Sequence, residues 1–184
     1  THCISSAASD VYKRQAFTSR DYDQLGYLPE ERGLYPKMTV EQQILYFAQL
    51  RGRTAAEIKP QIDEWLARFA VKGQRTDKIK DLSKGNQQKV QLIATLIHKP
   101  ALIILDEPFS GLDPVNAGLL EDGILWLKSQ GSAIIFSSHD MTNVAKISDR
   151  IVMLRNGQVV LSRKCRWSTS TVWPHETLLR ITVN

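Results

Sequence analysis

The residues of most chemical interest are two adjacent acids that follow an apolar run. Residues 102–105 read Leu-Ile-Ile-Leu, and Asp106 and Glu107 come directly after them. In an open α/β sheet, ligands bind outside the carboxyl ends of the strands. We therefore predict that Asp106 can hold Mg²⁺ and that Glu107 can orient or deprotonate an attacking water. A solvated acid pair at the end of a buried strand is the alternative interpretation.

Two other polar segments are positioned to meet a phosphate group. Ser83 and Gly85 lie just before a predicted helix over residues 86–98, where amides and a hydroxyl attract anions and a glycine permits close backbone approach. His139 follows a second apolar run, residues 133–136, so we expect it at the same sheet edge as Asp106. There its imidazole could form a hydrogen bond with a phosphate and so respond to the charge of that phosphate. An ordinary helix cap and a structural histidine are the alternatives.

Alternating strand and helix patterns supply the elements that would position these residues. Continuous apolar runs are typical of strands buried on both faces in a parallel sheet, and capping boxes mark two helix starts. The predicted strands are residues 25–28, 101–105 and 133–136, with a hairpin of 151–154 and 159–161 around Asn156-Gly157. The predicted helices are 39–51, 54–73, 86–98, 113–130 and 141–147. Short loops between alternating elements predict an α/β layered fold.

Composition narrows the class of protein. The chain has 184 residues, of which 42% are hydrophobic and 23% charged, so it can form one packed domain and is neither collagen-like nor wholly disordered. Two cysteines cannot form a disulfide framework, which favours a reducing compartment. The net charge of +5 arises in residues 1–20 and 162–184, whereas residues 21–161 are neutral. Nucleic-acid binding is therefore not expected, because a binding footprint needs basic residues clustered on one face.

Four segments stand in a characteristic order along the chain. They are Leu82-Ser83-Lys84-Gly85-Asn86, Leu102 to Glu107, Ser110-Gly111-Leu112-Asp113, and His139. In this order they closely resemble the signature, Walker B, D-loop and switch-histidine segments of an ABC transporter ATP-binding subunit. Residues 27–36, Tyr-Leu-Pro-Glu-Glu-Arg-Gly-Leu-Tyr-Pro, look like its Q-loop region. The resemblance spans residues 25–161 and is strongest to bacterial ABC-2-type exporter subunits, including those described as sodium exporters.

This resemblance implies a fold, two cofactors and a set of site residues. The fold is a partial P-loop NTPase of the ABC ATPase type, with a parallel-sheet core and a helical subdomain over about residues 39–98. The cofactors are ATP and Mg²⁺. By resemblance, the catalytic residues are Glu107 and His139, the metal-binding residues are Asp106 and Glu30, and the nucleotide-binding residues are Ser83, Gly85, Asn86, Asp113 and Glu30.

The sequence departs from the family pattern at several points. Glu30 stands where the family has Gln, and Lys84 and Asn86 replace the usual Gly and Gln of the signature. The 184 residues contain no Gly-x-x-x-x-Gly-Lys-Ser/Thr loop, which in the family cradles the phosphates. We therefore expect an N-terminally truncated fragment that binds ATP weakly or not at all and has negligible turnover.

Both ends of the chain differ from its middle. Residues 10–15 read Asp-Val-Tyr-Lys-Arg-Gln and resemble a translated sequencing adapter, so residues 1–20 are predicted to be a non-native leader. Residues 21–161 would form the partial nucleotide-binding domain. Residues 162–184 are an irregular tail, either disordered or read out of frame, in which 178–183 could form a strand of a small appended domain.

The resemblance also implies partners and a location. An exporter subunit of this kind couples ATP hydrolysis to substrate translocation at the cytoplasmic face of the membrane. It works as a homo- or heterodimer of nucleotide-binding domains bound to transmembrane permease subunits. Two alternatives remain open at this point: a soluble ABC ATPase of DNA repair or translation, and a non-catalytic fragment that only docks onto a partner.

Overall fold

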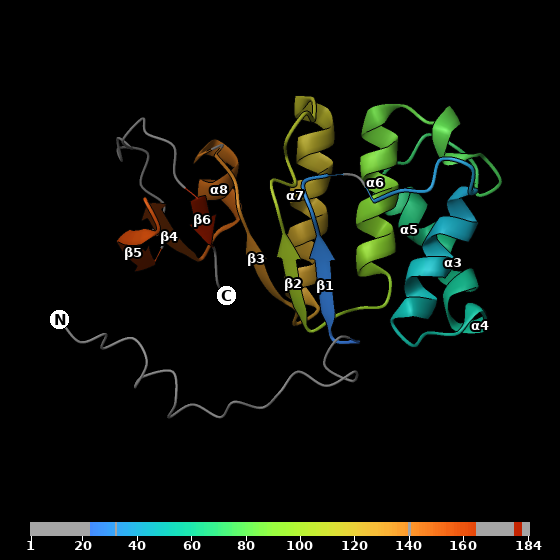
Figure 1. Ribbon diagram of the computed structural model, residues 1–184, viewed down its shortest axis with the longest axis horizontal. Coiled ribbons are helices and arrows are strands. Elements are labelled where there is room, and N and C mark those ends of the chain that lie inside the picture. The colour runs from blue at the N-terminus through green and yellow to red at the C-terminus, as the bar shows by residue number, and fades with distance from the viewer. Residues whose placement is uncertain (1–22, 32, 140, 165–178, 182–184) are drawn as a thin grey trace.

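A three-stranded parallel sheet forms the centre of the molecule (Figure 1). The computed structural model describes residues 23–31, 33–139, 141–164 and 179–181. Strands β1 (Leu25–Leu28), β2 (Leu102–Leu105) and β3 (Ala133–Phe136) pair in the order β1-β2-β3. Their last residues, Leu28, Leu105 and Phe136, are in register, so the strands end at one edge. The predicted α/β fold with a parallel sheet is confirmed.

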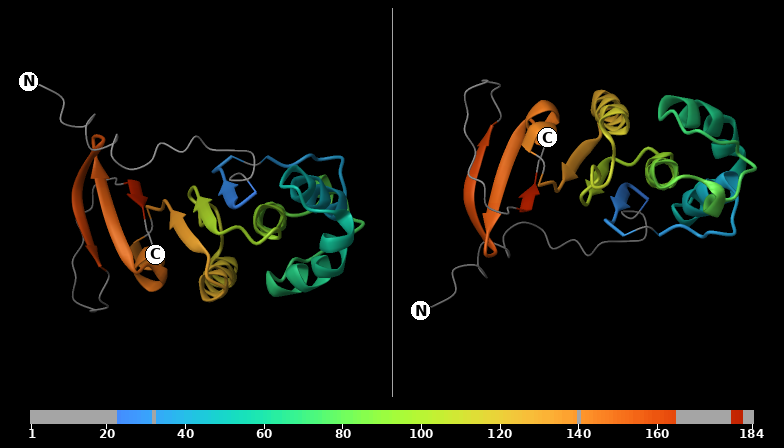
Figure 2. Two further views of the ribbon diagram at one scale, coloured as in Figure 1. Left: turned by 90° about the horizontal axis from the view of Figure 1, so that it is seen from below. Right: turned by 90° about the horizontal axis from the view of Figure 1, so that it is seen from above.

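Two helices cover the buried side of this sheet. Helix α6 (Lys84–Leu96) contacts β1, and α7 (Pro114–Ser129) contacts β3 and lies against one face (Figure 2). The buried strand residues share one core with Leu120, Ile124 and Leu127 of α7. The opposite face is different, because Leu102 and Ile135 are only half-buried and Tyr27 is 49% exposed. The prediction of strands buried on both faces therefore holds only in part within the described residues, because β2 and β3 are fully buried on the helix side and half-buried on the other.

The helical subdomain consists of short helices that lead into α6. They are α3 (Val40–Leu50), α4 (Ala55–Ile58), a 3₁₀ turn (Lys59–Gln61), α5 (Ile62–Arg68) and a second 3₁₀ turn (Ile79–Asp81). Both predicted capping boxes are present, at Thr39 and Thr54. One continuous helix to Gly73 is wrong, because Pro60 interrupts the helical hydrogen bonds and Ala70, at φ 45°, turns the chain after α5.

Aromatic contacts join the helical subdomain to the sheet layer. The ring of Trp65 in α5 meets Trp126 of α7 edge-on at 5.3 Å, and the Arg68 guanidinium lies 4.0 Å from the centre of the Trp126 ring. Phe69 occupies the space that a side chain at Gly123 would need. Helix α5 therefore packs tightly on α7, so the subdomain and the sheet share one core.

A second, antiparallel sheet follows the first along the chain. Helix α8 (Met141–Ile147) leads into β4 (Arg150–Arg155) and β5 (Gln158–Lys164), and β6 (Leu179–Ile181) pairs with the other edge of β4. Asn156 and Gly157 have φ values of 50° and 75°, as a two-residue type I′ hairpin requires, which confirms the predicted hairpin. Strand β5 extends to Lys164, into the segment predicted to be irregular. Residues 1–20, the predicted leader, and residues 165–178 lie outside the described residues.

Candidate active site

The sheet register sets Asp106 and Ser137 side by side. The hydrogen-bond ladder continues one residue past the strands, because Asp106 N donates to Leu28 O at 2.8 Å and Ser137 N donates to Leu105 O at 2.9 Å. Since Leu105 and Phe136 are paired and face the core, the next residue of each strand faces the other way. The two polar side chains therefore meet at the carboxyl edge.

A serine hydroxyl links the two predicted acids. Ser137 Oγ donates to Asp106 Oδ1 at 2.6 Å and accepts a hydrogen bond from Glu107 N at 3.0 Å. Glu107 adopts the left-handed conformation, at φ 44°, which is uncommon for a residue with a side chain. Such strained positions persist only where the surrounding contacts fix them, and they cluster at functional sites.

His139 joins the same network through the second acid. Its Nδ1 lies 2.9 Å from Glu107 Oε2, and its side chain is 70% exposed, whereas that of Glu107 is 20% exposed. The predicted placement of His139 at the same edge as Asp106 is therefore correct. The arrangement holds one carboxylate oxygen of Glu107 against the imidazole and leaves the histidine open to solvent.

A pocket of about 220 Å³ opens beside these acids. Its walls come from the ends of β1 and β2 and from α6, and its lining residues are Leu28, Pro29, Glu30, Gln88, Gln91, Asp106, Glu107, Pro108, Ser110 and Gly111. The structure thus brings Glu30, Asp106 and Glu107 together, as predicted. The volume is below the range of pockets that enclose a drug-sized ligand, so it suits one end of a nucleotide better than all of it.

The charges of this pocket fit a divalent cation. Three carboxylates line it, and their charge would repel a phosphate unless a cation lay between them. Carboxylate oxygens are ligands that suit Mg²⁺, which needs only one or two of them because it keeps several waters and binds substrate phosphates. Within the described residues, no cluster of three or more acids, histidines or cysteines could hold a metal by itself. A cation bound by one or two of these carboxylates would take its remaining oxygen ligands from water or from a phosphate.

The other predicted site residues form a separate group at the starts of α6 and α7. Ser83 Oγ accepts from Asn86 N at 3.3 Å, and Asp113 Oδ1 accepts from Asn116 N at 3.2 Å, so both residues cap helices. A side chain at Gly85 would lie 3.5 Å from Asn116 Nδ2, which brings the two helix starts together. None of these residues lines the acidic pocket.

Asn86 has a structural contact that the sequence did not indicate. Its Oδ1 accepts from Lys72 N at 3.1 Å, and its Nδ2 donates to Lys72 O at 3.2 Å. This amide therefore ties the first turn of α6 to the loop after α5. Its side chain is already engaged within the chain.

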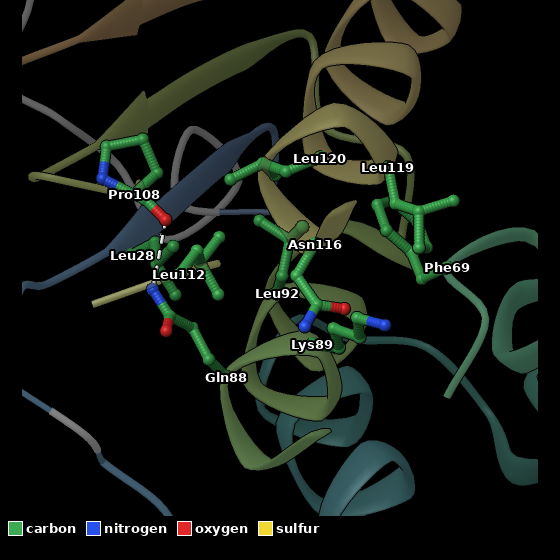
Figure 3. Close-up of a pocket in the computed structure, with 10 residues that line it drawn as sticks. All are labelled: Leu28, Phe69, Gln88, Lys89, Leu92, Pro108, Leu112, Asn116, Leu119 and Leu120. Carbon is green, nitrogen blue, oxygen red and sulfur yellow. Dashed lines mark hydrogen bonds between the residues drawn. The ribbon is translucent and has the colours of Figure 1, made fainter. Parts of the chain in front are cut away.

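Two glutamines of α6, Gln88 and Gln91, and one serine, Ser137, complete the site, and the sequence predicted no role for any of the three. Gln88 Nε2 donates to Pro108 O at 2.9 Å, a contact drawn in Figure 3, and lies 3.4 Å from Ser110 O. Gln91 Nε2 donates to Glu31 O at 3.3 Å. These bonds fasten α6 to the loops after β1 and β2. Of these three residues, only Ser137 could have been found from the sequence, because it directly follows the last residue of a strand just as Asp106 does.

Comparison with known proteins identifies the family. The family model described as "ABC transporter" matches residues 8–110, more than half of the chain. The chain belongs to the ABC transporter family. An uncharacterized ABC transporter ATP-binding protein of Alkalihalophilus pseudofirmus is 51% identical over 142 residues, which are 77% of this chain and 53% of that protein. The uncharacterized ABC transporter ATP-binding protein YhaQ of Bacillus subtilis is 47% identical over 144 residues, 78% of this chain and 48% of that protein.

A solved structure supports the same assignment for the fold. The structure described as the ATP-binding subunit of an ABC transporter matches with a TM-score of 0.70 at 30% identity, over 77% of this chain and 59% of that one. This chain therefore has the fold of the part of an ABC ATP-binding subunit that it matches. It spans about half the length of the curated relatives that it matches.

Proposed function

We propose that this ABC family chain is part of the ATP-hydrolysing subunit of an exporter. The observation that carries the proposal is the connected network of Asp106, Ser137, Glu107 and His139 beside an acidic pocket. A network of this kind presents one carboxylate for a cation and a second for a water, which is what hydrolysis of the terminal phosphoanhydride bond of ATP requires.

The residues of the pocket take distinct roles in this proposal. Asp106 and Glu30 would hold Mg²⁺, whose charge would offset that of the phosphates. Glu107 would orient the attacking water and accept its proton, because its carboxylate is partly buried and fixed by His139. His139 would also contact the terminal phosphate, since most of its ring is exposed.

The group at the helix starts would act on a nucleotide held by a partner chain. Ser83, Gly85 and Asp113 lie near the N-termini of α6 and α7, where helix dipoles and backbone amides favour anions. Asn86 would contribute by fixing the start of α6, because its side chain is bonded to Lys72. Two such chains would therefore form a homo- or heterodimer around ATP.

The exporter assignment and the location rest on similarity. The sequences of residues 27–36 and 82–89 resemble those of ABC-2-type exporters, and the two relatives compared above are named ABC transporter ATP-binding proteins. Among the described residues, no helix is long and apolar enough to cross a bilayer. We propose that the protein works at the cytoplasmic face of the membrane with permease subunits, which would contain the translocation path.

An ATPase assay of the full-length protein that contains this chain tests the proposal. We expect Mg²⁺-dependent hydrolysis that Glu107→Gln reduces at least about 100-fold, because Gln cannot accept the proton of the water. The 184-residue chain alone should be nearly inactive, since its sequence has no Gly-Lys phosphate loop. Full-length protein without ATPase activity, or hydrolysis insensitive to Glu107→Gln, would contradict the proposal. Turnover by the 184-residue chain would refute its predicted inactivity.

The proposed limits of the domain need a separate test. We propose that residues 1–20 are a non-native leader, although the family match begins at residue 8, and that residues 162–184 are a tail that is either disordered or read out of frame, although β5 continues to Lys164. Sequencing the source DNA across both ends decides this. A Gly-Lys-Ser/Thr loop in frame before Leu25, with a regular sequence in place of 162–176, is the expected result. Ends identical to the present sequence would instead favour a docking role.

A further inference from the structure

We infer that Ser137 is a positioning residue that fixes Asp106 and Glu107 as one unit. For its effect on catalysis this inference rests on the proposed function, but its structural part does not. The residue lies at the carboxyl end of β3, on a different strand from the two acids, and touches both of them. It thereby links two strands at the edge where the pocket opens.

The direction of the two hydrogen bonds is fixed by chemistry. A backbone N–H can only donate, so the Glu107 amide uses a lone pair of the Ser137 hydroxyl. The single hydroxyl proton is then left for Asp106 Oδ1, at 2.6 Å, a length typical of a hydroxyl bound to a carboxylate. The Ser137 hydroxyl therefore donates to the Asp106 carboxylate and accepts from the Glu107 amide, and the two hydrogen bonds cannot reverse direction.

This bond determines which oxygen of Asp106 faces a cation. Oδ1 accepts from Ser137, whereas within the described residues no hydrogen bond to Oδ2 is found. Asp106 lines the pocket together with Glu107. The serine therefore holds the carboxylate in one rotamer and leaves Oδ2 for a metal ion, as outer-shell partners of metal-binding carboxylates do.

The same hydroxyl stabilises the unusual backbone of Glu107. At φ 44° this residue has a conformation that L-residues rarely adopt. Three contacts hold it: its N–H donates to Ser137, its C=O accepts from Ser110 N at 3.0 Å, and its carboxylate meets His139. Loss of the hydroxyl would leave the partly buried N–H unsatisfied and free the carboxylate to move.

The other end of the same strand offers a matched control. Ser132, just before β3, donates its hydroxyl to Pro100 O at 2.9 Å. This bond, like that of Ser137, crosses from β3 to the β2 segment, but it touches neither acid. Ser132→Ala therefore removes the same group from the same pair of segments without affecting the pocket.

The experiment compares Ser137→Ala, Ser137→Thr and Ser132→Ala in the full-length protein. One readout is hydrogen exchange of the Glu107 amide, and the other is the Mg²⁺ concentration that half-saturates ATP hydrolysis. Ser137→Ala should speed the exchange and raise the half-saturating Mg²⁺ concentration by about tenfold each, with the KM for ATP unchanged. Ser137→Thr, which keeps the hydroxyl, should restore both values, and Ser132→Ala should leave both unchanged.

The two readouts separate this inference from the proposed function. Unchanged Glu107 exchange in Ser137→Ala, or an equal effect of Ser132→Ala, would overturn the positioning role. If the wild-type protein lacks ATPase activity, the proposed function fails. The positioning role would still be supported if the Glu107 amide exchanged faster in Ser137→Ala and not in Ser132→Ala. A raised KM for ATP without a change in Mg²⁺ dependence would also overturn the inference.

Discussion

The two edges of the central sheet use polar side chains in opposite ways. At the carboxyl edge, Ser137 bonds to Asp106 and His139 bonds to Glu107, so side chains bind one another beside a pocket. At the amino edge, Ser132 donates to a backbone carbonyl at 2.9 Å, and Arg53 donates to the His98 carbonyl at 3.2 Å. His98 itself is only 3% exposed, and its ring nitrogens have no hydrogen-bond partner among the described residues.

This difference separates polar residues that hold the fold from those that can act on a ligand. The strands and the register are the same at both edges, and each edge has a histidine and a serine. At the amino edge, the hydroxyl satisfies the backbone and the imidazole is packed into the core. At the carboxyl edge, carboxylate oxygens and an exposed imidazole remain available. The partners of a polar side chain therefore indicate its role better than its residue type does.

The sharpest contrast is between the two histidines. His139→Ala should lower ATP hydrolysis by about 100-fold, because it removes the group that holds the Glu107 carboxylate. Its midpoint of thermal unfolding should not change, since the side chain is 70% exposed. Steady-state kinetics and a thermal melt of the full-length protein measure both. If His139→Ala kept wild-type activity, the carboxyl edge of the sheet would not differ in function from the amino edge.

His98 should instead control how stability depends on pH. Burial lowers the pKa of His98 to about 4. The positive charges of Arg51 and Arg53 lower it further, whereas the backbone of Leu25 and the negative charge of Asp23 raise it by less than burial lowers it. Because its ordinary value is 6.5, the unfolded chain binds a proton between pH 6.5 and 4 that the folded chain does not. The free energy of unfolding should therefore fall by about 3 kcal/mol as the pH drops through this range.

Urea unfolding of the wild type and of His98→Leu at several pH values tests this. The variant should lose most of the slope between pH 6.5 and 4, because no titratable group remains at that position. ATP hydrolysis near neutral pH should be unaffected. Equal slopes in the two proteins would show that another group causes the acid sensitivity.

Close packing at the amino edge predicts a loss of stability without a loss of function. A side chain at Gly26 would lie 2.9 Å from Pro100 Cγ and 3.1 Å from Thr95 O. Gly26→Ala should therefore destabilise the protein by about 1–3 kcal/mol in urea unfolding. Gly118→Ala is the control, because nothing lies within 4 Å and it stands inside α7, so it should stabilise by about 0.5–1 kcal/mol. A neutral Gly26→Ala would mean that this edge is loosely packed.

The smallest expected effect concerns the start of α7. Asp113 caps this helix through Asn116 N. Asp113→Ala should cost about 1 kcal/mol, whereas Asp113→Asn should cost much less, because Asn caps equally well. If both variants lose the same free energy of unfolding, the charge of Asp113 stabilises the helix more than its capping hydrogen bond with Asn116 N does.

Much of this architecture was predictable because local signals agree with tertiary packing. The capping boxes at Thr39 and Thr54, the Asn156-Gly157 hairpin and the apolar runs of β2 and β3 each specify an element without help from distant residues. The acid pair was predictable for the same reason, since a parallel sheet collects strand ends at one edge. The break at Pro60 was missed because the apolar spacing continues across it.

The features that could not be predicted depend on contacts between distant segments. Ser137 became part of the site only when the register of β2 and β3 was known. The engagement of Asn86 with Lys72 depends on how the loop after α5 folds back onto α6. Half-burial of Leu102 follows from helices that pack on one face of the sheet, which an apolar run does not indicate.

The most direct test of the central claim is a Mn²⁺ titration of the ATP-bound full-length protein, followed by electron paramagnetic resonance. Wild type should be compared with Asp106→Asn, which keeps an oxygen to accept from Ser137 but removes the charge. If the carboxyl edge is a metal–phosphate site, the variant should bind Mn²⁺ at least about tenfold more weakly. Equal Mn²⁺ affinity in the two proteins would contradict the assignment of this edge as the active site.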